Sequence, residues 1–235
     1  MAGVNAARKL RGEGDFVLSR SESYIGTLID DLVTKGTNEP YRIMTSRSEY
    51  RLLLRQDNAD QRLTRRGYDI GLVSEERLRA VEEKYAAVDR EIRRLTHTGA
   101  SPSPALSAFL AERGTADVTD GCPLAALLRR PQLHYDDLAP FDPTRPDLPA
   151  DVREQVEIRV KYEGYIQRQQ KQVEEFRRME SHRLPPGLDY ASIQGLRLEA
   201  REKLAAVQPL DLGQAARISG VSPADIAALM IYLEH

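Results

Sequence analysis

The chain has 235 residues, and its 34 basic and 36 acidic side chains give a formal net charge of -2. This balance excludes a globally basic nucleic-acid binder, so any affinity for phosphates must come from a local patch. A single cysteine, Cys122, excludes an internal disulfide or a cysteine-based zinc site and fits a reducing cytoplasm. No apolar run approaches the roughly 20 residues that span a bilayer, so we expect no membrane partner.

The first part of the sequence predicts three short helices. Residues 2–11 form the first, and the apolar residues of 24–33 recur at helical spacing and predict a second that ends near Gly36. Ser46 and Glu49 have the spacing of a capping box, which predicts that a third helix begins there.

An arginine-rich segment follows the second predicted helix. Residues 42–66 hold seven arginines, no lysine and three acids, a local charge of +4. On a helix that begins at Ser46, Arg47, Arg51 and Arg55 would form one stripe, and like charges at this spacing disfavour an isolated helix by roughly a few tenths of a kcal/mol per pair. Nearby carboxylates could offset this repulsion, and so could an anionic ligand, since arginine suits bidentate phosphate contacts. The residues alone leave both explanations open.

The rest of the sequence predicts a mainly α fold. From Ser74 to about residue 95, apolar residues alternate steps of three and four, as in a packed helix pair. Residues 99–150 carry most of the thirteen prolines and predict a loop-rich subdomain. Further helices are expected at 105–112, 123–130, 151–180 and 198–207, with two short ones within 212–233.

Gly164 is unusual because it lies in the middle of the predicted helix 151–180, where glycine costs about 1 kcal/mol relative to alanine. Two explanations are open. The one that we favour is a close helix crossing, in which the missing side chain lets another backbone approach. The other is direct contact with a ligand.

The sequence offers little catalytic chemistry. The four histidines are scattered and none pairs at ligand spacing, so we expect no metal site and no catalytic residue. Cys122 lies in the loop-rich segment and is better explained as an incidental thiol than as a nucleophile. The last two helices resemble a helix-turn-helix, but the second is apolar and lacks base-reading side chains. We therefore expect a packing or partner-docking unit.

Five stretches of the chain are similar to one known family. The stretches are AGVNAAR (2–8), SYIGTLIDDLVTKGTNEPYRIMTSRSEYRLLLRQDNADQRLT (23–64), VEIRVKYEGYIQRQQKQVEEF (156–176), LPPGLDYASIQGL (184–196) and LGQAARISGVSPADIAALM (212–230). They resemble the C-terminal portion of the MnmG (GidA) family of tRNA uridine 5-carboxymethylaminomethyl modification enzymes. One departure is Arg197, which stands where the family commonly has a helix-capping serine.

The resemblance implies a function for the whole enzyme. Members of the family use FAD and NADH and act with the GTPase MnmE to modify C5 of the wobble uridine of tRNA. They are homodimers, and their helical C-terminal region is associated with tRNA and MnmE binding. Most flavin contacts would lie upstream of this chain, so we expect the chain alone to hold no cofactor and to be inactive.

The resemblance also guides the expected domains and sites. We expect residues 1–70 to be the tail of an FAD-binding domain, 71–150 a helical subdomain and 151–235 a terminal helical domain, with 233–235 resembling the scar before a histidine tag. The expected tRNA-facing surface consists of Arg42, Arg47, Arg51, Arg55, Arg62, Arg65 and Arg66. The expected MnmE-docking residues are Gly213, Gln214, Arg217, Gly220, Val221 and Pro223. The alternative is a purely structural or protein-binding helical module without tRNA contact.

Overall fold

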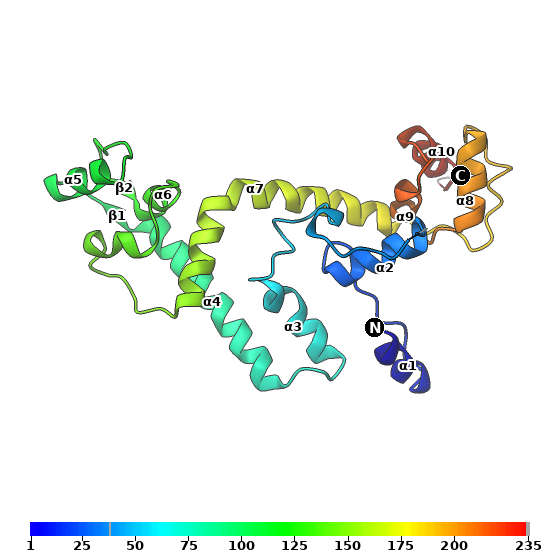
Figure 1. Ribbon diagram of the computed structural model, residues 1–235, viewed down its shortest axis with the longest axis horizontal. Coiled ribbons are helices and arrows are strands. Elements are labelled where there is room, and N and C mark those ends of the chain that lie inside the picture. Colours follow the sequence, from blue (N-terminus) through cyan, green and yellow to red (C-terminus); the bar gives the residue numbers. More distant parts are fainter. Residues whose placement is uncertain (38, 234–235) are drawn as a thin grey trace. The chain divides into compact units, whose positions relative to one another are not determined.

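The structure is a computed structural model that describes residues 1–37 and 39–233. It is mainly helical, as the sequence predicts (Figure 1). The chain forms two compact units, one of residues 1–59 with the residues from 168 onward, and the other of residues 60–167. The domain boundaries predicted at residues 70 and 150 stay a prediction.

The first unit begins with two of the predicted helices, α1 (Ala2–Leu10) and α2 (Tyr24–Thr34). Ser23 caps α2, because its Oγ accepts a hydrogen bond from the backbone N–H of Gly26 at 2.9 Å. A Cβ at Gly26 would lie 2.2 Å from the carbonyl oxygen of Ser19, so only glycine lets the preceding chain run this close to the helix.

The predicted helix at Ser46 is wrong. The segment forms a short 3-10 turn, η1 (Thr45–Arg47), and Ser48 is already extended. Glu49 does not complete a capping box, since its carboxylate accepts a hydrogen bond from Arg20 at 2.7 Å. The arginines of this segment therefore form no helical stripe.

A distant side chain holds the segment in its non-helical form. Gln169 lies on α7 (Ala150–Ser181), and its Oε1 accepts from the backbone N–H of Leu52 at 3.1 Å while its Nε2 donates to the carbonyl of Glu49 at 3.0 Å. Tyr50 and Leu54 are buried against Val173 of the same helix. These tertiary contacts satisfy backbone groups that a helix would otherwise pair internally, so they override the local capping signal.

The terminal residues of the first unit form a small helical bundle with its own apolar core. The bundle consists of α8 (Leu198–Val207), α9 (Leu212–Arg217) and α10 (Pro223–Leu233). Its core includes Tyr190, Ile193, Leu204, Leu212 and Leu229, each at most 1% exposed. These helices match the predicted ones, including Pro223 as the first residue of α10.

Arg197 precedes α8 and provides no side-chain cap for it. Its guanidinium instead donates to Asp225, with Nη2 and Oδ2 2.7 Å apart. Asp225 is fully buried and also accepts from the backbone N–H and the hydroxyl of Ser222 at 2.8 and 2.7 Å. Hydrogen bonds from Arg197, despite the opposing effect of burial, hold the pKa of Asp225 well below its usual range. Arg197 thus makes an ion pair with α10 in place of a local cap for α8.

The second unit contains α3 (Ala59–Asp69) and the long helix α4 (Glu75–His97), which Ser74 caps as predicted. Between α4 and α7 the structure has several short elements. They are β1 (Gly99–Ala100), α5 (Pro104–Glu112), β2 (Cys122–Pro123), α6 (Leu124–Leu128) and η2 (Asp136–Phe141). The two strands pair antiparallel, with Gly99 opposite Pro123.

The proline-rich segment builds most of the core of the second unit. Leu124, Leu127, Leu128 and Leu133 are completely buried, together with Val88 of α4. Pro104 stands at the start of α5, where its missing N–H is tolerated. The prolines therefore delimit short helices and loops around a packed core.

A charged group lies at the edge of this core. Arg94 donates to Glu91 through Nε and Nη2 at 2.8 and 2.7 Å and to Asp142 through Nη1 at 2.9 Å. Both carboxylates are buried, and Tyr135 donates its hydroxyl to Glu91 at 2.7 Å. Burial and this contact with a carboxylate raise the pKa of Tyr135 to about 12.

We expect Arg94→Ala to lower the free energy of unfolding by about 3–5 kcal/mol, because two buried carboxylates lose their cation. Urea unfolding of the 235-residue chain, followed by circular dichroism, measures this change. The matched control is Arg79→Ala. The partner of Arg79, Glu75, is mainly exposed, so this substitution should lower the free energy of unfolding by less than about 1 kcal/mol. Equal effects of the two substitutions would contradict the role of Arg94 as the cation that compensates two buried carboxylates.

Gly164 of α7 has open space beside it. Apart from its chain neighbours and the backbone of its own helix, a Cβ built there would meet no atom of residues 1–37 or 39–233 within 4 Å. Within the described chain, the close helix crossing that we favoured is therefore wrong.

Candidate functional site

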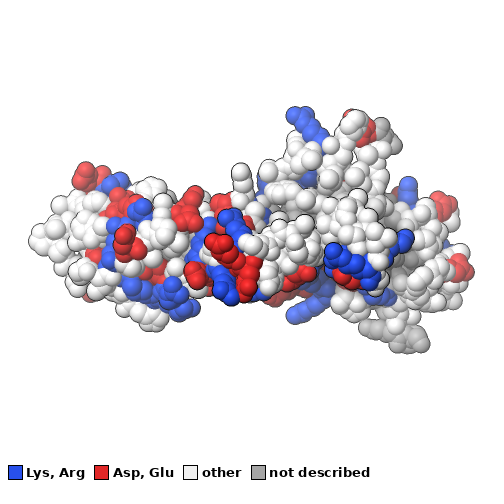
Figure 2. Space-filling view, turned by 90° about the horizontal axis from the view of Figure 1, so that it is seen from below, with Lys and Arg blue, Asp and Glu red and all other residues white. Residues whose placement is uncertain are grey.

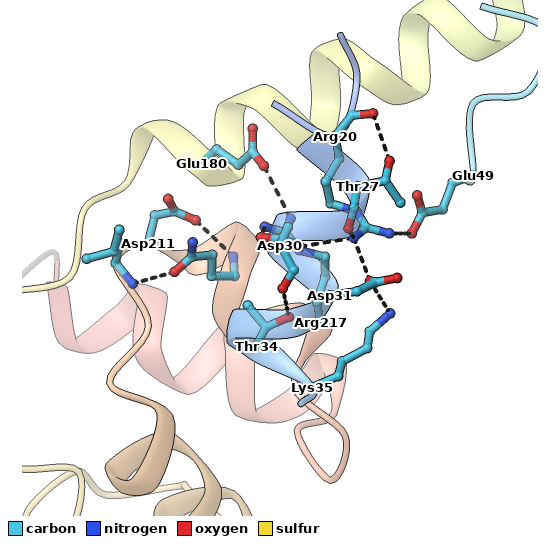
Figure 3. Close-up of polar contacts among 12 residues, drawn as sticks. Arg20, Thr27, Asp30, Asp31, Thr34, Lys35, Glu49, Glu180, Asp211 and Arg217 are labelled. Carbon is cyan, nitrogen blue, oxygen red and sulfur yellow. Dashed lines mark hydrogen bonds and ion pairs between the residues drawn. The ribbon is translucent and has the colours of Figure 1, made fainter. Parts of the chain in front are cut away.

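A network of ion pairs surrounds the buried Arg20, which precedes α2 and is 3% exposed (Figure 3). Its Nη1 donates to Asp31 at 2.7 Å, to Asp30 at 3.1 Å and to the carbonyl of Thr27 at 3.2 Å. Its Nη2 donates to Glu49 at 2.7 Å. One guanidinium thus joins α2 to the arginine-rich segment, with the charge-assisted hydrogen bonds that a buried cation needs.

Asp31 connects this network to Tyr41. It accepts from the hydroxyl of Tyr41 at 2.7 Å and from Lys35 at 3.0 Å. Burial opposes the ionisation of Asp31, but hydrogen bonds from Tyr41 and two cations hold the pKa of the carboxyl below its usual value. Burial and the bond to Asp31 raise the pKa of Tyr41 to about 12. The fixed ring of Tyr41 supports Arg47, whose Cζ lies 5.1 Å from the ring centroid.

Arg217 of α9 extends the network to the terminal bundle. Its side chain is 8% exposed, and it donates to Asp30 at 2.8 Å and to Glu180 at 3.2 Å. It also lies over the ring of Phe176, with Cζ 4.9 Å from the centroid. Burial raises the pKa of Glu180, as does the nearby charge of Asp211, whereas Arg217 lowers it. Arg217 is therefore a clamp between α2, α7 and α9.

The network consists of alternating cations and carboxylates. Its members are Arg20, Asp30, Asp31, Lys35, Glu49, Glu180 and Arg217. We call it the Arg20–Arg217 network. Its chemistry is suited to holding structural elements together.

Four of the seven predicted arginines lie in the first unit, on the segment that Glu49 joins to the Arg20–Arg217 network. Arg42 and Arg51 are exposed, and neither forms a hydrogen bond or ion pair with a described residue. Arg47 is exposed above Tyr41. Arg55 is engaged internally, since its Nε and Nη2 bind the carboxylate of Asp57 at about 3 Å.

The other three predicted arginines lie on α3 in the second unit. Arg65 pairs with Glu82 and lies over the ring of Tyr68 at 5.9 Å. Arg62 and Arg66 are partly buried and interact with other residues. The seven predicted arginines thus divide into exposed side chains and side chains already engaged by the fold. The tRNA-binding role of the set stays a prediction.

The predicted docking residues also differ in exposure. Gly213 is buried against α7, where a Cβ would lie 2.5 Å from Cγ of Glu180, and Arg217 is the clamp described above. Gln214 accepts from the backbone N–H of Leu210 at 2.8 Å. Gly220 has a positive φ of 96°, which glycine adopts without strain. Val221 packs on the bundle core and Pro223 is exposed. A docking role for these six residues stays a prediction.

Opposite charges also meet on the molecular surface. On the face shown in Figure 2, basic and acidic side chains lie next to one another in small groups. Exposed pairs such as Arg129 with Glu163 at 2.7 Å are of this kind, and each contributes little to stability. Among the described residues, no group of His, Cys, Asp or Glu is arranged to hold a metal ion. None of the described helices has the length and apolar character needed to cross a membrane.

Two family models match the chain. Residues 75–170 match the tRNA modifying enzyme MnmG/GidA C-terminal helical domain, and residues 172–235 match the MnmG/GidA C-terminal helical bundle. The chain belongs to the MnmG/GidA family. The two matches meet at residue 171 within α7, and the first corresponds to the greater part of the second compact unit.

Individual relatives agree with this assignment. The tRNA uridine 5-carboxymethylaminomethyl modification enzymes MnmG of Caldicellulosiruptor saccharolyticus and Bacillus subtilis are 54% and 52% identical over the whole chain. The solved structure of Aquifex aeolicus GidA in the form II crystal is 40% identical and superposes with a TM-score of 0.84 over 100% of this chain and 37% of that one. The chain spans 38% and 37% of the two curated relatives, so it corresponds to a part of them.

Sequence reasoning missed the network around Arg20 and Arg217. The available signal was the adjacent pair Asp30 and Asp31 on the apolar helix 24–34, which places carboxylates next to a buried face. Spacing along the chain could not supply the partners, because Arg217 and Asp30 are 187 residues apart.

We expect Arg217→Met to lower the free energy of unfolding by about 3 kcal/mol, because Glu180 loses its cation while Asp30 keeps Arg20. Thermal and urea unfolding measure the loss. It should shrink as the pH falls from about 8 towards 5, because protonation of Glu180, whose pKa is already raised, removes the unpaired charge.

The control for this substitution is Arg183→Met. The side chain of Arg183 is 71% exposed and lies 3.6 Å from Asp211, so its loss should change stability by less than about 0.5 kcal/mol. A pH-independent loss in the Arg217 variant would contradict the role of Glu180.

Proposed function

We propose that this chain is the C-terminal part of an enzyme that, with the GTPase MnmE, installs the carboxymethylaminomethyl or aminomethyl group at C5 of the wobble uridine of tRNA. The chain serves tRNA and MnmE binding and is not catalytic alone. The names of its relatives support the reaction class. The observation that carries the binding role is that Arg42 and Arg51 are exposed and pair with no residue of 1–37 or 39–233, on a segment that Glu49 joins to the Arg20–Arg217 network.

Arginines without a protein partner are the side chains best able to bind RNA phosphates. Arg42, Arg47 and Arg51 are exposed within ten residues of each other, and their backbone is held by Tyr41, Glu49 and Gln169. A fixed segment loses less conformational entropy on binding than a flexible one. Phosphate contacts of this kind position the tRNA, and base contacts would specify it.

FAD and NADH belong to the proposed whole enzyme. The stretch at 2–8 that is similar to the flavin-binding part of the family forms only helix α1. The strands among residues 1–37 and 39–233 are two residues long, whereas a strand, a glycine-rich loop and a helix commonly hold a dinucleotide pyrophosphate. We therefore propose that the cofactors bind outside this chain, and homodimer formation and a cytoplasmic location are likewise proposals for the whole protein.

The end of α10 is one of the exposed apolar parts of the terminal bundle, beside Leu198 and Leu210, and is the part that we propose docks MnmE. Ile231 and Tyr232 are 60% and 44% exposed, and Met230 is 39% exposed. Apolar side chains on a surface otherwise rich in charge favour a protein partner. The alternative, a helical module that binds protein only, is favoured by the internal pairing of Arg55 and Arg65.

We expect Arg42→Gln and Arg51→Gln to weaken tRNA binding by the full-length protein roughly tenfold each, equivalent to about 1.4 kcal/mol. Each should also reduce the slope of log affinity against log salt concentration by about one, because one phosphate contact is lost. A salt titration of tRNA binding measures both, with Lys203→Gln, an exposed cation of the terminal bundle, as the control. Unchanged affinity and slope would leave only the protein-binding alternative.

We expect Ile231→Ser and Tyr232→Ala to weaken MnmE association by roughly tenfold or more without unfolding the bundle, since both side chains are exposed. Pull-down and calorimetric titration with the full-length protein test this. Deleting residues 212–235 would be a poor test, because it removes the buried Leu212 and Leu229. The matched control is Leu72→Ser, an exposed leucine of the second unit, and equal loss in the control would refute the assignment.

A further inference from the structure

The backbone around Arg51 is bound on both sides by a single side chain of α7. Gln169 donates through Nε2 to the carbonyl of Glu49 at 3.0 Å and accepts through Oε1 from the backbone N–H of Leu52 at 3.1 Å. Both residues belong to the first compact unit, like Arg51 itself. One primary amide therefore uses its donor and its acceptor to fix the main chain immediately before and after Tyr50 and Arg51.

Packing holds the same turn against α7. Tyr50 and Leu54 are 5% and 1% exposed, and they pack with Val173, which lies one helical turn after Gln169. Arg51 stands between these two buried residues and is exposed. It forms no hydrogen bond or ion pair with residues 1–37 or 39–233. The turn thus has an anchored inner side and presents one cation on its outer side.

Arg55 contributes to the turn from within the segment. Its Nη1 donates to the carbonyl of Leu52 at 2.8 Å, while its Nε and Nη2 bind the carboxylate of Asp57 at 3.0 and 2.9 Å. Both backbone polar groups of Leu52 are therefore occupied by side chains, one from Gln169 and one from Arg55. The residue that follows Arg51 is held more firmly than a residue in an ordinary surface turn.

We propose that Gln169 is a positioning residue for tRNA binding, which fixes the backbone from which Arg51 reaches a phosphate. A guanidinium binds phosphate through N–H groups in a rigid fork, so the direction of its approach matters. A backbone that is fixed before binding also loses less conformational entropy on binding. The inference rests on the proposed tRNA-binding role of Arg51 and gives Gln169 itself no contact with the RNA.

The test is a double-mutant cycle on the tRNA affinity of the full-length protein, with Gln169→Met and Arg51→Gln alone and together. Methionine keeps the unbranched, flexible shape of glutamine but lacks the amide that makes both hydrogen bonds. We expect Gln169→Met to weaken binding by about fourfold in the parent and by less than about 1.5-fold in the Arg51→Gln background, because a positioning residue acts only through the residue that it positions.

A second cycle with Arg42→Gln separates positioning from a general loss of structure. Arg42 lies outside the turn, next to Tyr41, whose hydroxyl is held by Asp31 at 2.7 Å. The effects of Gln169→Met and Arg42→Gln on affinity should therefore multiply, whereas a merely structural effect of Gln169 would treat both arginines alike. Gln170→Met, at the exposed neighbouring position of α7, is the matched control and should bind tRNA normally.

Hydrogen exchange checks the contact itself. The amide of Leu52 should exchange faster in Gln169→Met than in the parent, and at the parent rate in Gln170→Met. The bond to Glu49 is exposed and the bond to Leu52 is only partly buried, so water can replace the lost amide and Gln169→Met should keep the fold.

The possible failures are distinguishable. If Arg51→Gln leaves tRNA affinity unchanged, the proposed role of Arg51 fails and this inference fails with it. If Arg51→Gln weakens binding but Gln169→Met does not, or weakens it equally in the parent and in the Arg51→Gln background, only this inference is overturned. Unchanged exchange of the Leu52 amide in Gln169→Met would also overturn it, since the contact would then not hold the turn.

Discussion

The buried guanidinium of Arg20 is the interaction on which the first unit depends. Removing a cation from water is costly, and the structure offsets this cost with three carboxylates and a carbonyl. Burial acts against the charged form, but the bonds to Glu49 and Asp31 raise the pKa of Arg20, so the cation is permanent. Because its partners lie on α2 and on the arginine-rich segment, this side chain holds that segment against α2, while Gln169 and Val173 hold it against α7.

Arg217 contacts Asp30, the same carboxylate that Arg20 contacts. Asp30 lies between Arg20 and Arg217, so α2 is tied both to the segment that follows it and to the terminal bundle. The pair joins residues that are 187 positions apart, and Glu180 of α7 completes it. Loss of either cation would leave a buried carboxylate, which explains why a network of this kind specifies one arrangement.

Most helices could be predicted from the sequence because their signals are local. Ser74 and Pro223 mark the starts of α4 and α10 in the sequence as they do in the structure. The helix at Ser46 could not be judged locally, since Glu49 is used by Arg20 and the backbone by Gln169, which lies 117 residues from Leu52. The prediction of the candidate site was limited for the same reason. Composition located the arginines, but only tertiary contacts show which of them interact with other residues of the chain.

The number of arginines in a segment therefore does not measure its capacity to bind an anion. Arg55 is matched by Asp57 and Arg65 by Glu82, so their charges are largely compensated before any ligand arrives. Arg42 and Arg51 have no such partner among the described residues, so their charges are not compensated by a neighbouring carboxylate there. The local charge of +4 thus includes both arginines that are paired with carboxylates and arginines that are not. The cations that bind should be those that the fold positions through their neighbours and leaves unpaired.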